Sequence, residues 1–264
     1  MIARTLAVST RGVAGVLGLS VLLGLGQPGV SAQDAMGTPS GANMGNCVTA
    51  LGIGQEGDAC VNVVHASPDA PAVDVYVDGA EALSGLEFGA TSGWVALPAG
   101  EHQIQVTAAD AALDTAVIDA DVTLEEGAAY EIAATGLLAE IAPQIYPVDL
   151  SMLGSDDESM ARVRVVHASP DAPAVDVAVA GGDVLIENLP FTEASDYLDV
   201  PADSYDLEVR PTGTTDVALD LPGVALEAGT VYSVYAIGHV ADGSLTVLPV
   251  TATAVAPEMA TPSA

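Results

Sequence analysis

The sequence of 264 residues contains no lysine, and its five arginines stand against 36 aspartates and glutamates. Nucleic-acid-binding proteins depend on Lys and Arg for their phosphate contacts, so this charge balance excludes DNA and RNA as partners. Aromatic residues are scarce too, with one Trp and two Phe. Because half of the residues are nevertheless hydrophobic, we expect folded cores that are built mainly from aliphatic side chains.

Known catalytic motifs are absent as well. The sequence has no Gly-x-Ser-x-Gly nucleophile elbow, no His-Glu-x-x-His zinc motif and no Gly-x-x-x-x-Gly-Lys phosphate loop. Its only cysteines are Cys47 and Cys60, which are expected to form a disulfide in an exported protein. The sequence therefore predicts a protein that is not an enzyme, with no cysteine left for catalysis.

The first 32 residues have the features of a secretory signal peptide. Arg4 and Arg11 accompany a short apolar run over residues 13–25, and Val30-Ser31-Ala32 provides the small residues of a cleavage site. The run is too short and too rich in glycine to predict a membrane span, although an uncleaved N-terminal anchor is the alternative. We expect a protein that is secreted, extracellular or in the cell envelope, with no membrane insertion after signal removal.

One segment occurs twice. Residues 63–75 return unchanged as residues 165–177, and an identical segment at this offset indicates two copies of one structural unit. Both copies continue as short alternating strands separated by Gly and Pro turns, about seven strands per copy. The fold class expected is all-β, with two tandem antiparallel β-sandwich domains of immunoglobulin-like or transthyretin-like outline. Pro147 and Pro249 should confine the last strand of each copy to a sheet edge or end.

The domain organisation follows from this repeat. We expect six segments along the chain: a signal peptide (1–32), a partly flexible N-terminal extension (33–58), β-sandwich repeat 1 (59–151), an acidic linker (152–160), β-sandwich repeat 2 (161–251) and a flexible tail (252–264). Cys60 corresponds to Arg162 in the second copy, so the disulfide belongs to the extension rather than to the repeated fold. If Val61 faces the core, Cys60 faces outward, where it could attach the extension to the first strand.

The repeated segment allows two interpretations. Ser67-Pro68-Asp69-Ala70-Pro71 has strong turn chemistry, and a neutral His65 could bond a turn carbonyl or the carboxylate of Asp69 or Asp74. The alternative is a transition-metal site, because imidazole and carboxylate together suit zinc and its neighbours. The candidate ligands are His65, Asp69 and Asp74 in the first copy and His167, Asp171 and Asp176 in the second. Oxygen-only clusters, such as Asp119 with Asp121 or the acidic run at 156–158, would instead suit calcium.

The same segment carries a family resemblance. His-Ala-Ser-Pro-Asp-Ala-Pro-Ala-Val-Asp-Val (65–75), followed by Tyr-Val-Asp-Gly (76–79), resembles the bacterial exported family known as domain of unknown function 4397, and residues 167–177 repeat the motif. The resemblance implies an exported β-sandwich, often in tandem, with no established reaction. The second copy has Ala178 and Ala180 in place of Tyr76 and Asp78, which weakens any shared site that would use those side chains.

We therefore expect a noncatalytic secreted or cell-envelope module that binds a partner or has a structural role. An envelope or extracellular protein, or a glycan, could be its partner. The alternatives are a secreted metal-dependent hydrolase and a calcium-stiffened surface spacer; apart from that calcium, no cofactor is expected.

Overall fold

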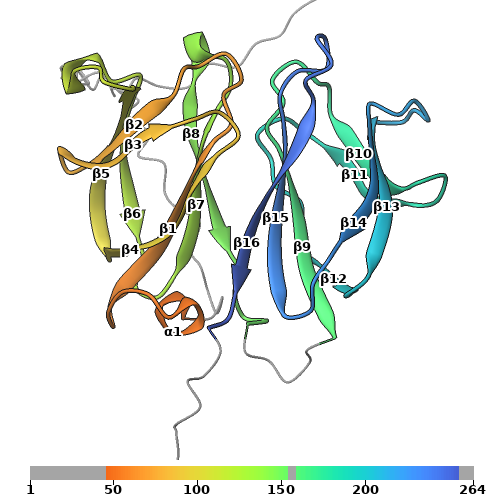
Figure 1. The fold of residues 1–264 in the computed structure, drawn as a ribbon, viewed down its shortest axis with the longest axis horizontal. Helices are drawn as coiled ribbons and strands as arrows, with labels where there is room; N and C mark the ends of the chain where they lie inside the picture. The colour runs from red at the N-terminus through yellow and green to blue at the C-terminus, as the bar shows by residue number, and fades with distance from the viewer. Residues whose placement is uncertain (1–45, 154–158, 256–264) are drawn as a thin grey trace, which may run out of the picture. The chain divides into compact units, whose positions relative to one another are not determined.

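The computed structural model describes residues 46–153 and 159–255. The expected signal peptide (1–32) lies outside the described residues, as do parts of the N-terminal extension, the acidic linker and the tail. Among the described residues, no helix has the length and hydrophobicity needed to cross a bilayer. The described chain is almost entirely β-structure, as expected (Figure 1).

Residues of the first repeat form eight strands, here called sandwich 1. Their bounds are β1 (Asp58–His65), β2 (Val73–Val77), β3 (Ala80–Leu86), β4 (Thr91–Pro98), β5 (Gly100–Ala108), β6 (Ile118–Leu124), β7 (Ala129–Thr135) and β8 (Ala142–Val148). They make two four-stranded sheets with the orders β4-β1-β7-β8 and β3-β2-β5-β6. Short 3-10 turns at Leu113–Thr115 and Leu138–Glu140 lie in the loops before β6 and β8.

The second repeat, here called sandwich 2, has the same plan. Its strands are β9 (Met160–His167), β10 (Val175–Val179), β11 (Val184–Leu189), β12 (Leu198–Pro201), β13 (Ser204–Pro211), β14 (Leu219–Ala225), β15 (Thr230–Ile237) and β16 (Thr246–Thr253). The sheet orders are β12-β9-β15-β16 and β11-β10-β13-β14. The tandem β-sandwich prediction is therefore confirmed.

Each sandwich has one strand more than the seven expected. The side chains of β3 and β11 are mostly exposed, so these two strands lack a clear alternating pattern in the sequence. In both copies the first strand pairs in parallel with the seventh, β1 with β7 and β9 with β15. Two four-stranded sheets differ from the seven-stranded arrangement of constant immunoglobulin domains, so the transthyretin-like outline is the better description.

The closing strands lie where their prolines predicted. Pro147 is in β8 and Pro249 is in β16, and each of these strands is the edge of its sheet. An edge position suits proline because one side of the strand needs no N–H donor. The folded part of repeat 2 extends past its expected end at residue 251, since β16 reaches Thr253 and Ala252 is buried.

The N-terminal extension is attached to sandwich 1 by the expected disulfide. Helix α1 (Cys47–Leu51) is capped by the side chain of Asn46, which accepts from the Thr49 N–H, and it ends at Gly52 with a φ of 65°. Cys47 bonds to Cys60, and both are fully buried. Cys60 does lie on the face of β1 opposite to Val61, which packs in the core of sandwich 1.

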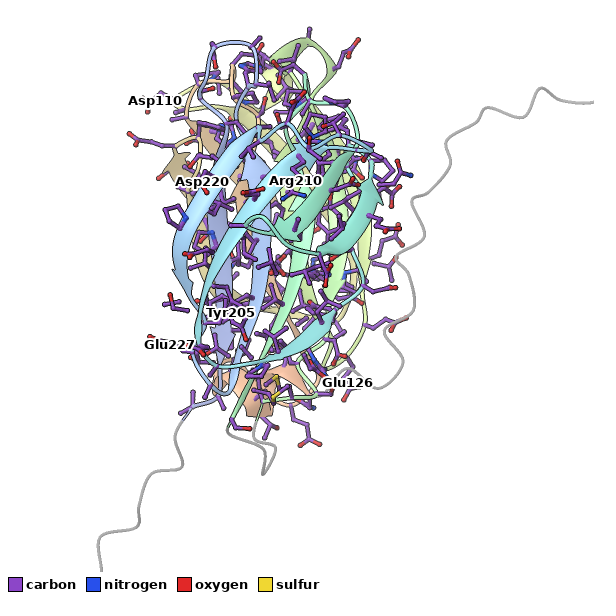
Figure 2. The ribbon with its side chains drawn as sticks, turned by 90° about the vertical axis from the view of Figure 1, so that its right-hand side faces the viewer. Asp110, Glu126, Tyr205, Arg210, Asp220 and Glu227 are labelled. Atoms are coloured by element: carbon purple, nitrogen blue, oxygen red, sulfur yellow. A yellow bond between two sulfur atoms is a disulfide. The ribbon has the colours of Figure 1, made fainter. Side chains whose placement is uncertain are left out.

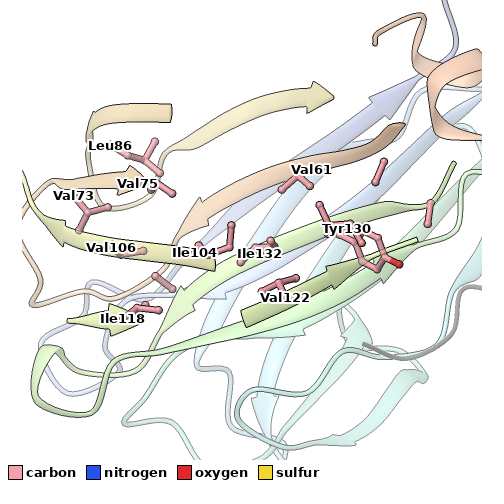
Figure 3. Packing of buried hydrophobic residues seen from close by; sticks show 14 residues of the cluster. Val61, Val73, Val75, Leu86, Ile104, Val106, Ile118, Val122, Tyr130 and Ile132 are labelled. Carbon is pink, nitrogen blue, oxygen red and sulfur yellow. The ribbon is translucent and has the colours of Figure 1, made fainter. Parts of the chain in front are cut away.

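The sheets of sandwich 1 enclose one continuous aliphatic core. Figure 3 shows Val61, Val75, Ile104, Val122 and Ile132 meeting between the two sheets. Since successive residues of a strand point to opposite faces, β1 sends its odd-numbered side chains into this core. On the other face of β1, Cys60 and Val64 are also buried, and they pack in clusters that contain residues of sandwich 2.

Candidate functional site

The repeated segment forms the corner where the chain leaves one sheet and enters the other. It joins β1 to β2 in sandwich 1 and β9 to β10 in sandwich 2. His65 is the last residue of β1 and is fully buried. Its Nε2–H donates to the carbonyl oxygen of Pro71 at 3.0 Å, while Nδ1 accepts from the N–H of Ser67 at 3.4 Å. An imidazole that supports the scaffold was expected to bond either a turn carbonyl or a nearby carboxylate, and His65 bonds the turn carbonyl.

His167 repeats this arrangement. Its Nε2 bonds the Pro173 carbonyl at 3.0 Å, and its Nδ1 accepts from the Ser169 N–H at 3.3 Å. Burial lowers the pKa of both imidazoles, against a smaller opposing effect of the proline carbonyls. Both imidazoles are therefore held neutral, with both ring nitrogens already hydrogen-bonded to the backbone.

An aromatic ring covers each imidazole. The Phe88 ring lies edge-on to His65 at 6.2 Å between centroids, and Phe191 lies edge-on to His167 at 6.0 Å. These are the only two phenylalanines of the chain. They were not among the candidate residues, although their offset of 103 residues, close to that of the repeated segment, is a signal in the sequence. The pairing adds to the buried, sealed environment of the two histidines.

Asp74 and Asp176 each bind two backbone N–H groups, one from an irregular strand (β3 or β11) and one from the loop after β5 or β13. Asp74 accepts from the N–H of Gly85 at 2.7 Å and from the N–H of Asp110 at 2.8 Å. Asp176 accepts from the N–H of Asn188 at 2.7 Å and from that of Gly213 at 3.0 Å. All four donors have positive φ, between 51° and 74°, so they sit where the strand ladder is interrupted. The Asn188 N–H lowers the pKa of Asp176, with Gly213 and Thr212 adding to it against a partial burial penalty.

Asp69 and Asp171 bind the loop that precedes the last strand of each sandwich. Asp69 accepts from the Leu138 N–H at 2.7 Å, and Asp171 accepts from the N–H groups of Val240 and Ala241, both at 2.9 Å. Although burial raises the pKa of Asp171, these backbone donors lower it more. The histidine and the two aspartates of each copy thus bind three different backbone regions at one end of the sandwich.

The six candidate metal ligands therefore have backbone partners in both copies. Within residues 46–153 and 159–255, no group of three or more His, Cys, Asp or Glu side chains is arranged to hold a metal ion. Asp119 of the proposed oxygen cluster accepts from the side-chain amides of Gln103 and Gln105. The acidic run at 156–158 lies outside the described residues.

The loops held by this corner carry exposed apolar side chains. Leu137 and Leu138 lie in the loop before β8 and are each 39% exposed, and Val240 in the loop before β16 is 41% exposed. Val117 and Val217, at the ends of the loops after β5 and β13, are also exposed. Asp69 and Asp171 bond directly to the backbone of Leu138 and Val240, so the rigid corner positions these side chains.

A buried ionic network between the two sandwiches was not expected from the sequence. Arg164 on β9 donates to Glu131 Oε2 on β7 at 3.0 Å, to the Pro147 carbonyl at 2.6 Å and to Ser233 Oγ at 2.8 Å. The Tyr235 hydroxyl donates to the same Glu131 oxygen at 2.8 Å. Glu131 and Arg164 are 1% and 4% exposed. Each of the three guanidinium nitrogens thus donates one hydrogen bond, which offsets part of the cost of burying the charge.

Electrostatics inside this network support a charged pair. Burial alone lowers the pKa of Arg164, but the Glu131 carboxylate more than offsets this, so the pKa lies above its usual value. Burial, followed by the Glu131 charge, raises the pKa of the Tyr235 hydroxyl well above its usual range. Trp94 adds a bond between the sandwiches, because its Nε1–H donates to the Thr251 carbonyl at 2.9 Å.

Likenesses to solved structures are distant. The Bacillus anthracis TIE protein is 9% identical, covering 69% of this chain and 34% of that protein, with a TM-score of 0.22; this chain thus spans about a third of its length. A proposed cell adhesion protein of Bacteroides ovatus is 9% identical over 78% of this chain and 100% of its own, with a TM-score of 0.23. The family 26 carbohydrate-binding module CBMbc of Eubacterium rectale Amy13K, in complex with maltoheptaose, is 14% identical over 76% and 98%, with a TM-score of 0.21. At such TM-scores, these likenesses carry no argument about function.

The family of the chain is shown by its sequence. No curated protein matches the chain. A family model matches twice, over residues 59–160 and over residues 161–261, and each match contains one copy of the corner built around His65 or His167. The chain therefore belongs to the family described as Domain of unknown function (DUF4397), of which it carries two tandem copies.

Proposed function

We propose that this protein is a noncatalytic module that acts outside the cell, where the loops at the corner end of its sandwiches bind an envelope or extracellular protein or a glycan. One observation carries this proposal. In both copies the imidazole and the two carboxylates of the repeated segment bind backbone and fix the surrounding loops. Side chains used in this way support a scaffold, and rigidly held loops on a scaffold are common binding surfaces.

Three further properties support an extracellular role. Cys47 and Cys60 are bonded, and disulfides persist mainly in oxidising compartments. The sequence begins with a segment that has the features of a signal peptide. The strongly acidic composition gives a hydrated surface that repels nucleic acid and anionic lipid, which leaves neutral glycans and proteins as partners.

The experiment compares binding by the full chain with binding by loop variants. Binding to a glycan array and to isolated cell-envelope proteins would be measured for the wild type and for L137S/L138S/V240S. Val95→Ser is the matched control, because Val95 is equally exposed but lies on the edge strand β4. We expect the loop variant to lose about tenfold or more in affinity for a defined glycan or purified protein, at an unchanged melting temperature.

Two results would contradict the proposal. One is equal binding by the loop variant and the wild type. The other is a stoichiometric zinc, manganese or iron ion in the purified protein that H65Q/H167Q removes together with a hydrolytic activity. Elemental analysis of the same samples decides the second point.

A further inference from the structure

Sandwich 2 contains an apolar cavity between its sheets. The cavity has a volume of about 230 Å³, and both sheets supply its walls. Lining residues include Val163, Leu207, Leu221, Leu226, Val234 and Pro249. Residues of β14 and β16 line one side, and these are the edge strands of the two facing sheets. The cavity therefore lies toward the edge of the sandwich where β14 and β16 face each other.

Apolar space continues across the sandwich. A second cavity of about 70 Å³ lies toward the opposite edge, where Leu185 of β11 and Leu198 of β12 contribute to it. Val163, Val165 and Leu207 belong to the walls of both cavities. The buried core of sandwich 2 is correspondingly split into two clusters, one around Val209 and one around Tyr232.

Sandwich 1 provides an internal comparison, because a cavity of only about 80 Å³ lies between its sheets, where Val61, Ile104 and Ile132 help to line it. Val61 and Tyr130 pair in sandwich 1 as Val163 and Tyr232 pair in sandwich 2. Val61 is 2% exposed and Tyr130 is fully buried, whereas Val163 is only half-buried and Tyr232 is 8% exposed. The buried residues of sandwich 1 form one cluster (Figure 3). Both copies thus have some apolar space between their sheets, and the cavity beside β14 and β16 in sandwich 2 is larger than the one in sandwich 1.

Two substitutions between the copies remove volume. Ile132 and Ile145 pair across β7 and β8, and the corresponding pair across β15 and β16 is Val234 and Pro249. A void in a well-packed core costs free energy because its lining atoms lose contacts. A second copy that keeps the smaller residues is therefore more consistent with a binding site than with a core optimised for stability.

A strand irregularity contributes to the cavity. β14 carries one extra residue at Pro222-Gly223, where its register with β13 shifts between Tyr205 and Leu207. Gly223 has a φ of 66° and donates its N–H to Asp206 Oδ1 at 2.8 Å. In β6 the pairing with β5 is regular, and Val122 is fully buried, whereas Val224 is half-buried. Bulges of this kind redirect side chains next to binding sites.

We propose that this cavity binds a neutral apolar small molecule, such as an uncharged alkyl chain or a ring hydrocarbon. No charged side chain lines it, and the hydroxyl of Tyr232 already accepts from the Glu227 N–H at 2.9 Å. Asp220 in β14 and Glu227 just after it, both labelled in Figure 2, would repel an anionic head group. The volume exceeds the roughly 150 Å³ of an apolar cavity that binds benzene. The proposal is independent of the loop surface described above.

The test uses the full chain and the neutral fluorescent probe N-phenyl-naphthylamine. The wild type is expected to bind one probe per chain, and octanol should displace it while octanoate should not. V234I/P249I, which restores the two residues of sandwich 1, is expected to weaken probe binding at least tenfold. Ile118→Val is the matched control in sandwich 1, because Ile118 is buried in the core but does not line the cavity of that sandwich, and it should leave probe affinity within twofold of the wild type.

A second measurement remains decisive if V234I/P249I folds poorly. Methyl NMR shifts on addition of octanol should be concentrated at Leu207, Leu221 and Leu226, with Ile104 and Val122 of sandwich 1 unchanged. The proposal is overturned if the wild type shows no saturable binding, if filling the cavity leaves affinity unchanged, if octanoate competes better than octanol, or if the shifts arise in sandwich 1. Concentration-dependent dimerisation that the probe prevents would assign the site to a second copy of the chain and would also overturn it.

Discussion

Single residues of the corner show how a buried imidazole makes stability depend on pH. His65 and His167 are neutral in the folded protein because burial lowers their pKa values. In the unfolded chain they titrate near about 6.5. Their contribution to stability is therefore complete above about pH 6.5, and it is lost as the pH falls from there toward the folded pKa, since only the unfolded state then binds the protons.

We predict that the free energy of unfolding of the wild type falls between about pH 7.5 and about pH 5.5. H65Q/H167Q should remove most of this pH dependence, because glutamine has no proton to bind in this range. At pH 7.5 the double variant should be less stable by about 1–3 kcal/mol per site, the usual effect of disturbing a buried hydrogen bond. Urea denaturation at both pH values measures each quantity.

His102 serves as a control, because its contribution to stability should change with pH in the opposite direction. Burial alone lowers its pKa, but the bonds to the Asp78 carboxylate and the Pro98 carbonyl raise it above the usual value. Its stabilising effect is therefore present below about pH 6.5 and is lost as the pH rises through the folded pKa. His102→Gln should make the acid destabilisation steeper. A wild type that is more stable at pH 5.5 than at pH 7.5 would contradict our account of His65 and His167.

At the scale of strands, both faces of β1 and β9 are buried, each against a different partner. One face of β9 packs inside sandwich 2, and the other carries Arg164 into the network with Glu131. Removing one member of a buried ion pair leaves an uncompensated charge, which typically costs about 3–5 kcal/mol. Replacing both members avoids that penalty.

We predict that Arg164→Met and Glu131→Gln each destabilise the protein strongly, and that R164M/E131Q is clearly more stable than the sum of the two effects implies. Residues in one network usually show coupling of about 0.5–3 kcal/mol. Urea denaturation of the four proteins gives the coupling energy directly. R162M is the comparison for a less buried network, since the Arg162 side chain is 16% exposed and bonds Asp149 and Asp199, and its loss should cost less than the loss of Arg164. Additive effects at Glu131 and Arg164 would mean that the pair does not form.

The strands also show how far sequence reasoning could reach. The repeat, the alternation along β1 and the edge prolines were enough to predict the sandwiches, the edge strands and the direction of Cys60, because each depends on local geometry. The partner of Arg164 could not be predicted in this way. The position of Arg164 between Val163 and Val165 indicates the opposite strand face, but nothing in the local pattern says that β7 of the other copy covers that face. Glu131 is one of 36 acidic residues, and only the pairing across copies distinguishes it.

For the whole molecule, the dominant property is its negative charge. The formal net charge is −31 at pH 7, and exposed carboxylates such as Asp220 and Glu227 cover the sheet seen in Figure 2. Like charges repel in the compact state, and this repulsion weakens when salt shortens the Debye length. The unfolded chain spreads the same charges over a larger volume, so it gains less from added salt.

We predict that raising sodium chloride from about 10 mM to about 150 mM increases the melting temperature, because the Debye length falls from about 30 Å to about 8 Å. For a chain of this size, 1 kcal/mol corresponds to about 2–4 °C, and we expect a rise of at least that amount.

Calcium chloride at the same ionic strength separates screening from binding. An equal melting temperature indicates screening alone, whereas an additional rise that follows the calcium concentration would support the calcium-stiffened spacer, because only a specific ligand of the folded state stabilises by mass action. A melting temperature that does not change with sodium chloride would mean that self-repulsion of the acidic surface is negligible.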